Sequence, residues 1–221
     1  MIKQLAAVAA ALALSVPAMA TSVIYQQDFE SDASGFSGGS VEGSQGYAGV
    51  GFGSSLLRSD GTVTLTLNLE QAVQNARLSL SLGILDSWDD GSLGYGPDRF
   101  QVSLDGRAAP LFDEVFDNFQ GRGPTTATGL SSLAYAQDLG FRVVFGDSAY
   151  SLDLALGNLS AGVHTLSFTA YGPGWQGGDD ESFALDNVTL TTGAAVPEPG
   201  SLALAGLGLG ALGLAGRRRQ G

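Results

Sequence analysis

Apolar residues alternate with polar ones along most of the central part of the chain. In the clearest run, from Val63 to Leu69, every second residue is Val or Leu, with Thr or Asn between them. The same period of two recurs over residues 78–84, 100–104, 141–145, 152–156, 164–168 and 183–185. Strict alternation is typical of antiparallel strands that are buried on one face, so each of these runs predicts a strand.

The spacing of the runs predicts the fold class. Glycine, asparagine, aspartate and proline gather between them, as turns require. No segment shows a convincing helical period, although residues 71–77 and 131–138 each have room for one or two helical turns. The glycine-rich segment 36–53 predicts a loop or weak edge strands, and 121–129 a second flexible segment. About eight to ten strands of this kind predict an all-β, two-sheet antiparallel sandwich of jelly-roll type.

The last run contains an irregularity. Phe183 and Leu185 define one face, whereas Val188 and Leu190 have the opposite parity. A β-bulge at Asp186 and Asn187 restores a common face for all four apolar residues. Such a bulge directs a carboxylate and a free carbonyl group sideways from the ladder.

Residues 1–20 have the pattern of a secretory signal peptide. Lys3 supplies the positive charge, residues 5–14 are apolar, and Ala18-Met19-Ala20 forms a small-x-small cleavage site. The apolar run is too short to span a bilayer, so we expect cleavage after Ala20 and an exported β-sandwich domain over residues 21–193.

The C-terminal part, residues 194–221, has three elements in order. Pro197-Glu198-Pro199 interrupts regular structure, residues 201–216 are uncharged and rich in Leu, Ala and Gly, and Arg217, Arg218 and Arg219 follow at once. Such an apolar run predicts a short C-terminal transmembrane helix of roughly 24 Å. The arginine cluster places its end in the cytoplasm.

These three elements resemble the PEP-CTERM sorting signal of bacterial surface proteins. The resemblance implies recognition by an exosortase, which cuts near the Pro-Glu-Pro motif while the precursor is anchored in the inner membrane. It also implies a host with an outer membrane and exopolysaccharide production. The alternative is an ordinary C-terminal membrane anchor.

Composition excludes several classes of function. The 221-residue chain has a formal net charge of −12, and residues 21–196 hold 21 of the 22 acidic residues against six arginines, a net charge of −15. There is no basic footprint for nucleic acid, and an acidic surface outside the cell favours divalent cations. Without cysteine there are no disulfides or thiolate metal sites, and one histidine cannot form a multi-histidine zinc centre.

Acidic residues near the two ends of the body resemble those of carbohydrate-binding-module jelly rolls. An early Asp28-Phe29-Glu30 and a late Asp186-Asn187-Val188 match the family's motifs. The resemblance implies one structural Ca²⁺, with Asp28, Glu30, Asp186 and Asn187 as the metal site, and hard oxygen ligands suit this ion. The alternative is a set of plain surface acids.

Two other acidic clusters lie at Asp179-Asp180-Glu181 and in the segment 86–98. The second predicts a further cation site or a ligand-binding loop, or else a solvated turn; its candidate residues are Asp86, Asp89, Asp90 and Asp98. Aromatic residues near glycines are candidates for glycan contact or for inward packing, and these are Trp88, Tyr95, Tyr171 and Trp175.

Catalysis finds little support in the sequence. His164 lies in an alternating run, which predicts a strand histidine, and no G-x-S-x-G nucleophile motif is present. The predicted function is a non-enzymatic secreted or surface-anchored protein, sorted by exosortase and associated with exopolysaccharide or biofilm matrix. A more specific version of this prediction is that the protein binds glycans. The alternative is a small extracellular glycoside hydrolase that uses loop carboxylates.

Overall fold

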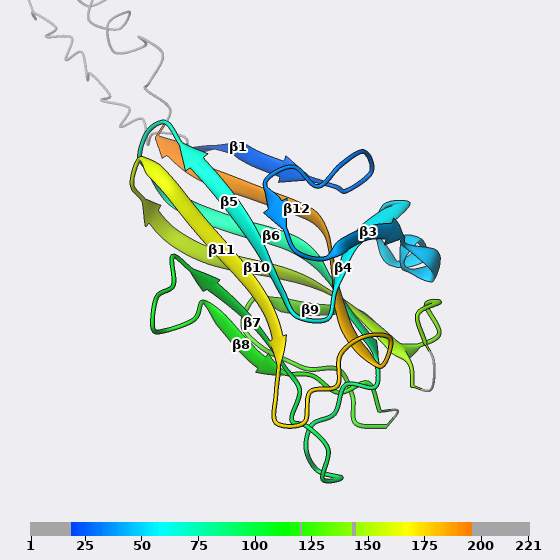
Figure 1. Ribbon diagram of the computed structural model, residues 1–221. Helices are drawn as coiled ribbons and strands as arrows, with labels where there is room; N and C mark the ends of the chain where they lie inside the picture. Colours follow the sequence, from blue (N-terminus) through cyan, green and yellow to red (C-terminus); the bar gives the residue numbers. More distant parts are fainter. Residues whose placement is uncertain (1–18, 120, 143–144, 196–221) are drawn as a thin grey trace, which may run out of the picture. The chain divides into compact units, whose positions relative to one another are not determined.

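Two antiparallel β-sheets pack face to face in the computed structural model, which describes residues 19–119, 121–142 and 145–195 (Figure 1). The larger sheet has the order β3 (Ser40–Gly43), β4 (Ser55–Ser59), β12 (Glu181–Ala195), β6 (Val73–Asp86), β10 (Asp147–Leu159) and β9 (Leu130–Gln137). β1 (Met19–Gln27) also pairs with β12. The smaller sheet has the order β2 (Phe36–Ser37), β5 (Thr62–Leu69), β11 (Gly162–Tyr171), β7 (Arg99–Leu104) and β8 (Phe112–Val115). The prediction of an all-β, jelly-roll-like sandwich is confirmed.

The alternating runs become strands because each buries one face. In β5 the three residues Val63, Leu65 and Leu67 are buried, and the polar residues between them are not. Six of the seven predicted runs lie inside strands; the exception is 141–145. Its described residues are irregular, because the Phe141 N–H bonds to the Asp147 carboxylate, at 3.2 Å, instead of to a neighbouring strand.

Neither of the two segments that had room for a helical turn is helical. Most of 71–77 belongs to β6, and most of 131–138 belongs to β9. β10 pairs with both strands, so pairing partners that are distant in sequence override the local preference. The glycine-rich segment 36–53 does contain weak edge strands, β2 and β3, followed by a 3₁₀ helix, η1 (Gln45–Val50).

The main core lies between the sheets. Its aromatic side chains come from both layers: Phe100 of β7 and Phe183 of β12 meet edge to face, with ring centroids 5.1 Å apart. Full burial of such a side chain contributes roughly 1.5–3 kcal/mol, so these rings hold the two sheets together.

A second, smaller core covers the outer face of the larger sheet. Tyr47 of η1 packs there with Phe52, Leu85 and Ala184. The Tyr47 hydroxyl donates to the carbonyl oxygens of β6 and β10, at 3.2 and 3.1 Å. The last half of β6 is therefore buried on both faces, and Ala184 on the outer face of the neighbouring strand β12 is buried with it.

The predicted bulge in β12 is confirmed. The register with β6 shifts between Asp186 and Thr189, and Asn187 has a left-handed φ of 50°. Phe183, Leu185 and Val188 all reach the main core as a result.

The predicted signal peptide (apart from Met19 and Ala20, which lie in β1), the Pro-Glu-Pro motif, the apolar helix and the arginine cluster lie outside the described residues. Within the part of the chain that the structure describes, no helix is long and apolar enough to cross a membrane.

Candidate functional site

One acidic corner joins the segment after β1 to the bulge of β12. Glu30 Oε1 accepts the Ser55 N–H at 3.1 Å, and Glu30 Oε2 accepts the Ser54 hydroxyl. Asp186 Oδ2 accepts the Gly53 N–H at 2.7 Å. A Cβ on Gly53 would lie 2.0 Å from Glu30 Oε1 and 3.6 Å from Asp186 Oδ2. The two carboxylates therefore flank this glycine, although they come from opposite ends of the body.

Electrostatics at this corner favour a positive ligand. Burial raises the pKa of Asp186 to about 6, and the negative charges of Glu30 and Asp28 add to the effect. Hydrogen bonds from Ser54 and Ser55 lower the pKa of Glu30, which keeps that group charged. A cation between Glu30 and Asp186 would offset their repulsion.

Asp28 and Asn187, the other two residues of the predicted calcium site, take part in the acidic corner less directly. Asp28 is exposed, and its Oδ1 accepts the Glu30 N–H at 3.2 Å. The Asn187 amide nitrogen donates to Gly51 O at 3.0 Å and to Ser81 Oγ at 3.2 Å. Both residues therefore support the loops around the corner, and the carboxylates of Glu30 and Asp186 would be the principal oxygen ligands of a cation bound there.

A second acidic site lies where the segment between β6 and β7 meets the start of β12. Carboxylate oxygens of Asp89, Asp98 and Glu181 all lie within 4.8 Å of one another. Among residues 19–119, 121–142 and 145–195, these are the three His, Asp or Glu side chains grouped closely enough to share an ion. Figure 1 shows the two contributing segments at the same end of the sandwich.

The loop closes around this site through paired hydrogen bonds. Asp98 Oδ2 accepts the Asp89 N–H at 2.6 Å, and the Asp98 N–H donates to the Asp89 carbonyl oxygen at 2.8 Å. Gly96 makes this closure sterically feasible, because a Cβ there would lie 2.5 Å from the Asp89 carbonyl oxygen and its φ is +73°.

Asp86 and Asp90 are not part of this group. Asp86 accepts the Phe145 N–H at 3.0 Å, and Asp90 forms an ion pair with Arg122 and accepts the Ser92 N–H at 2.8 Å. The sequence grouped four aspartates of one loop, whereas the structure selects two of them and adds Glu181. The sequence placed Glu181 in a separate acidic cluster, and its position opposite Asp86 could not be predicted because it depends on the pairing of β12 with β6.

The four candidate aromatic residues differ in exposure. Trp88 is 1% exposed, packs edge to face on Phe116 and Trp175, and donates its ring N–H to Ser182 O at 2.9 Å. Of the two alternatives for Trp88, glycan contact is wrong and inward packing holds, because the core and this hydrogen bond involve the whole ring. Trp175 is half-buried, and Tyr95 is 68% exposed.

Tyr171 has a role in the smaller sheet. Its hydroxyl donates to the Asp113 carboxylate at 3.0 Å, and Arg99 donates to the same carboxylate at 2.8 Å. The ring is half-buried. Of the four aromatic residues, Tyr95 therefore offers the most open ring.

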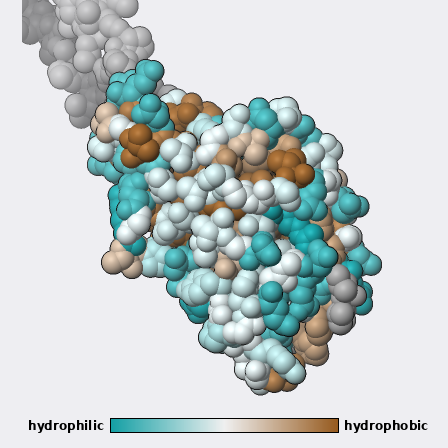
Figure 2. Space-filling view, viewed as in Figure 1, coloured by the Kyte–Doolittle hydropathy of each residue, from teal (hydrophilic) through white to brown (hydrophobic). Residues whose placement is uncertain are grey.

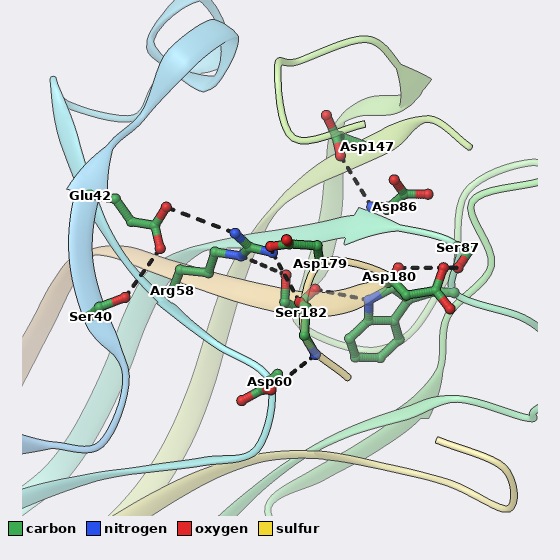
Figure 3. A network of polar contacts seen from close by, with 12 residues as sticks. Ser40, Glu42, Arg58, Asp60, Asp86, Ser87, Asp147, Asp179, Asp180 and Ser182 are labelled. Atoms are coloured by element: carbon green, nitrogen blue, oxygen red, sulfur yellow. Dashed lines mark hydrogen bonds and ion pairs between the residues drawn. The ribbon is translucent and has the colours of Figure 1, made fainter. Parts of the chain in front are cut away.

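A polar hollow of about 370 Å³ lies around Arg58. The guanidinium donates to Ser182 Oγ at 2.8 Å and to Asp179 Oδ1 at 3.1 Å, while Glu42 lies 3.9 Å away (Figure 3). Polar side chains and glycines form the walls: Gly39, Ser40, Glu42, Arg58, Ser59, Asp60, Gly178 and Asp179. Hydrophilic and weakly hydrophobic residues dominate the face seen in Figure 2, with hydrophobic residues in separate patches.

His164 is a satisfied strand histidine, as the sequence predicts. Its Nδ1 lies 2.8 Å from Asp105 Oδ2, and its Nε2 lies 3.0 Å from Ser160 O. Both neighbours are acceptors, so both ring nitrogens donate when the imidazole is protonated. The hydrogen bond with Asp105, followed by that with Ser160, raises the pKa of His164.

Fold and sequence together define an exported all-β protein with a sorting signal. Residues 195–219 match the family model of the PEP-CTERM protein-sorting motif. No curated protein matches the chain. The motif implies exosortase-mediated processing, so this is an exported protein that is processed at the membrane and sorted to the cell surface or the extracellular space.

Proposed function

We propose that this chain is a non-enzymatic protein of the bacterial surface or its matrix, whose sandwich binds polysaccharide. The observation that carries the proposal is the sorting motif at residues 195–219, because it directs the body to the cell surface or the extracellular space. There, the resemblance to this class of signal leads us to expect exopolysaccharide. A sandwich with two well-packed cores supplies a rigid support for such binding.

The polar hollow around Arg58 supports glycan binding. Its carboxylates, from Glu42, Asp60 and Asp179, are acceptors for sugar hydroxyl groups, and Arg58 is a donor. Trp175 donates its ring N–H to Asp60 O at 2.9 Å, which holds an aromatic ring near the hollow. A few polar groups beside a flat ring are typical of small-ligand sites.

Glycan binding is tested by titrating the purified protein with the host's own exopolysaccharide and with a glycan array. We expect the double variant Glu42→Gln, Asp179→Asn to weaken binding by about tenfold, since it removes two charged acceptors at roughly 1 kcal/mol or less each. The matched control is Asp153→Asn, because Asp153 is also an exposed aspartate paired with an arginine, Arg77, in a different hollow. Equal affinity of the double variant and the wild type contradicts the proposal.

Burial favours a binding module over the alternative hydrolase. Burial raises the pKa of both Asp89 and Asp98, that of Asp98 to about 7, as a general acid requires. Yet Asp98 is 0% exposed and Glu181 is 1% exposed, so these groups are closed to a sugar chain. Release of shorter oligosaccharides that stops in Asp89→Asn and Asp98→Asn would instead establish the hydrolase.

We also propose that Ca²⁺ binds between Glu30 and Asp186 and ties the two ends of the body together. An ion that binds only the folded form stabilises it by mass action, and no disulfide serves this purpose here. We expect a chelator to lower the melting temperature by roughly 5 °C and Asp186→Asn to reduce that difference. A melting temperature that is the same with calcium and with chelator contradicts this part of the proposal.

A further inference from the structure

Asp98 is a fully buried carboxylate with one oxygen that lacks a partner. Oδ2 accepts the Asp89 N–H, whereas Oδ1 has no hydrogen-bond partner in the described part of the chain. Leaving a buried carboxylate oxygen bare is unfavourable unless a proton or a cation neutralises it. Asp98 Oδ1 therefore marks a position where a ligand is expected.

The two neighbouring carboxylates are held close to the Asp98 carboxylate. Glu181 Oε2 accepts the Gln176 N–H at 2.6 Å, which fixes the Glu181 side chain in the buried site. Together with Asp89, these groups place three carboxylate oxygens within 4.8 Å. Burial first, and then the charges of Glu181 and Asp89, raise the pKa of Asp98 to about 7. Three carboxylates this close repel one another when they are ionised, and a bound cation offsets that repulsion.

The described residues contain no side-chain cation that neutralises this cluster. Arg122 pairs with Asp90 and lies 3.9 Å from Asp117, and Arg58 pairs with Asp179. Among residues 19–119, 121–142 and 145–195, no ion pair joins an arginine or the histidine to any of the three carboxylates. Among the described residues, the neutralising charge is therefore left to a proton or a cation from solvent.

We propose that Asp89, Asp98 and Glu181 bind one divalent cation of the Ca²⁺ class. Three carboxylates offer up to six hard oxygen ligands, and water completes the six to eight that Ca²⁺ takes. Asp89 is half-exposed, which gives the ion a route from solvent. The ion would join the segment between β6 and β7 to the start of β12. This site is separate from the Glu30–Asp186 corner and does not depend on glycan binding.

Terbium luminescence tests the site directly, because Tb³⁺ replaces Ca²⁺ and emits when a nearby tryptophan transfers energy to it. Trp88 precedes Asp89 in the chain, and Trp175 packs on Trp88 with ring centroids 4.9 Å apart. We expect tryptophan-sensitised Tb³⁺ emission from the purified full chain and its displacement by Ca²⁺ at 10⁻⁴ to 10⁻³ M, the range of extracellular calcium modules. Absence of sensitised emission at millimolar Tb³⁺ overturns the proposal.

Two test variants and two control variants show whether the ion binds at Asp89, Asp98 and Glu181. Asp98→Asn keeps the shape and the acceptor for the Asp89 N–H but removes the charge, and Glu181→Gln does the same for the third ligand. We expect either change to weaken Tb³⁺ and Ca²⁺ binding at this site by at least about tenfold. The matched controls are Asp186→Asn, at the other acidic corner, and Asp90→Asn, in the same loop, and both should retain the emission. Equal emission from Asp98→Asn and the wild type overturns the proposal.

Thermal melting gives a second, independent readout in the Asp186→Asn background, where the other corner is disabled. At pH 8, we expect saturating Ca²⁺ to raise the melting temperature by roughly 5–10 °C. Adding Asp98→Asn should leave the melting temperature in chelator unchanged or higher, since it removes repulsion, and should abolish the rise with calcium. A rise that persists in the double variant overturns the proposal.

Discussion

Buried carboxylates in this protein differ in how their charge is satisfied. Asp147 is fully buried and accepts three backbone N–H groups, from Asp86, Leu139 and Phe141. Asp186 accepts two, from Gly53 and Asn187. Asp98 accepts one, and its Oδ1 has no hydrogen-bond partner among the described residues. The series separates Asp147, a carboxylate that organises loops, from Asp98, which supports the proposed cation site.

The pair His164–Asp105 predicts a defined pH dependence of stability. The pKa of His164 is raised above its ordinary 6.5, chiefly by the hydrogen bond with Asp105, so its contribution is complete below pH 6.5 and is lost as pH rises through the folded-state pKa. The pKa of Asp105 is lowered from 3.8: partial burial opposes this, but hydrogen bonds from His164 and Thr165 outweigh it. The contribution of Asp105 is therefore present above pH 3.8 and is lost as pH falls through the folded-state value.

We expect His164→Gln to lower the free energy of unfolding by about 1 kcal/mol between pH 5 and 6, because a partly exposed charged hydrogen bond is lost. The difference from the wild type should shrink toward pH 9, where the wild-type imidazole is neutral. Urea denaturation across pH measures it, with Val163→Thr as a control at an exposed neighbour. A pH-independent difference would show that the charge of His164 contributes nothing.

The bulge in β12 determines both the packing of the main core and the position of Asp186 at the acidic corner. It lets Phe183, Leu185 and Val188 share the main core, and it turns Asp186 toward Gly53. Asn187 adopts the left-handed φ of the bulge, and its side chain donates hydrogen bonds to Gly51 O and Ser81 Oγ. Asparagine suits this position because it tolerates the left-handed region and donates hydrogen bonds.

Two substitutions separate these contributions. Asn187→Ala loses the hydrogen bonds and puts at this positive φ a residue that tolerates the left-handed region less well than asparagine, so we expect a loss of about 2 kcal/mol. Asn187→Gly loses the same bonds but relieves the backbone, and we expect about 1 kcal/mol. Urea midpoints in the presence of chelator, at constant m-value, give both numbers. An Ala variant as stable as the Gly variant would mean that the backbone of Asn187 carries no strain.

The sequence predicts individual strands and this bulge well because both depend on local parity. Residues 63–69 and 183–190 specify their own faces. The acidic site of Asp89, Asp98 and Glu181 could be predicted only in part, because Glu181 arrives through the pairing of β12 with β6. For Trp88 the sequence left glycan contact and inward packing both open, since the choice depends on contacts with Phe116 and Trp175.

For the whole molecule, charge and destination fit together. Residues 21–196 carry a net charge of −15. Part of this charge lies at the acidic corner of Glu30 and Asp186, and another part lies at the second acidic site, formed by Asp89, Asp98 and Glu181. Self-repulsion of this size destabilises a compact body unless counter-ions bind. The extracellular space, where the sorting motif directs the protein, is also where millimolar divalent cations are available.

The Pro-Glu-Pro motif predicts how the whole chain is processed at the membrane. Replacing Pro197, Glu198 and Pro199 together by alanine removes the motif's recognition element and lies outside the sandwich, so folding of residues 21–193 should be unaffected. In a host with an exosortase, we expect the variant to be exported but to remain in the membrane fraction at precursor mass, whereas the wild type is shortened and leaves it. Fractionation with mass spectrometry measures this, and the wild-type chain in an exosortase-deficient host is the control, since it should accumulate at the same mass. A variant that is shortened and released like the wild type would show that the motif does not direct processing, and the body would then reach the surface by another route.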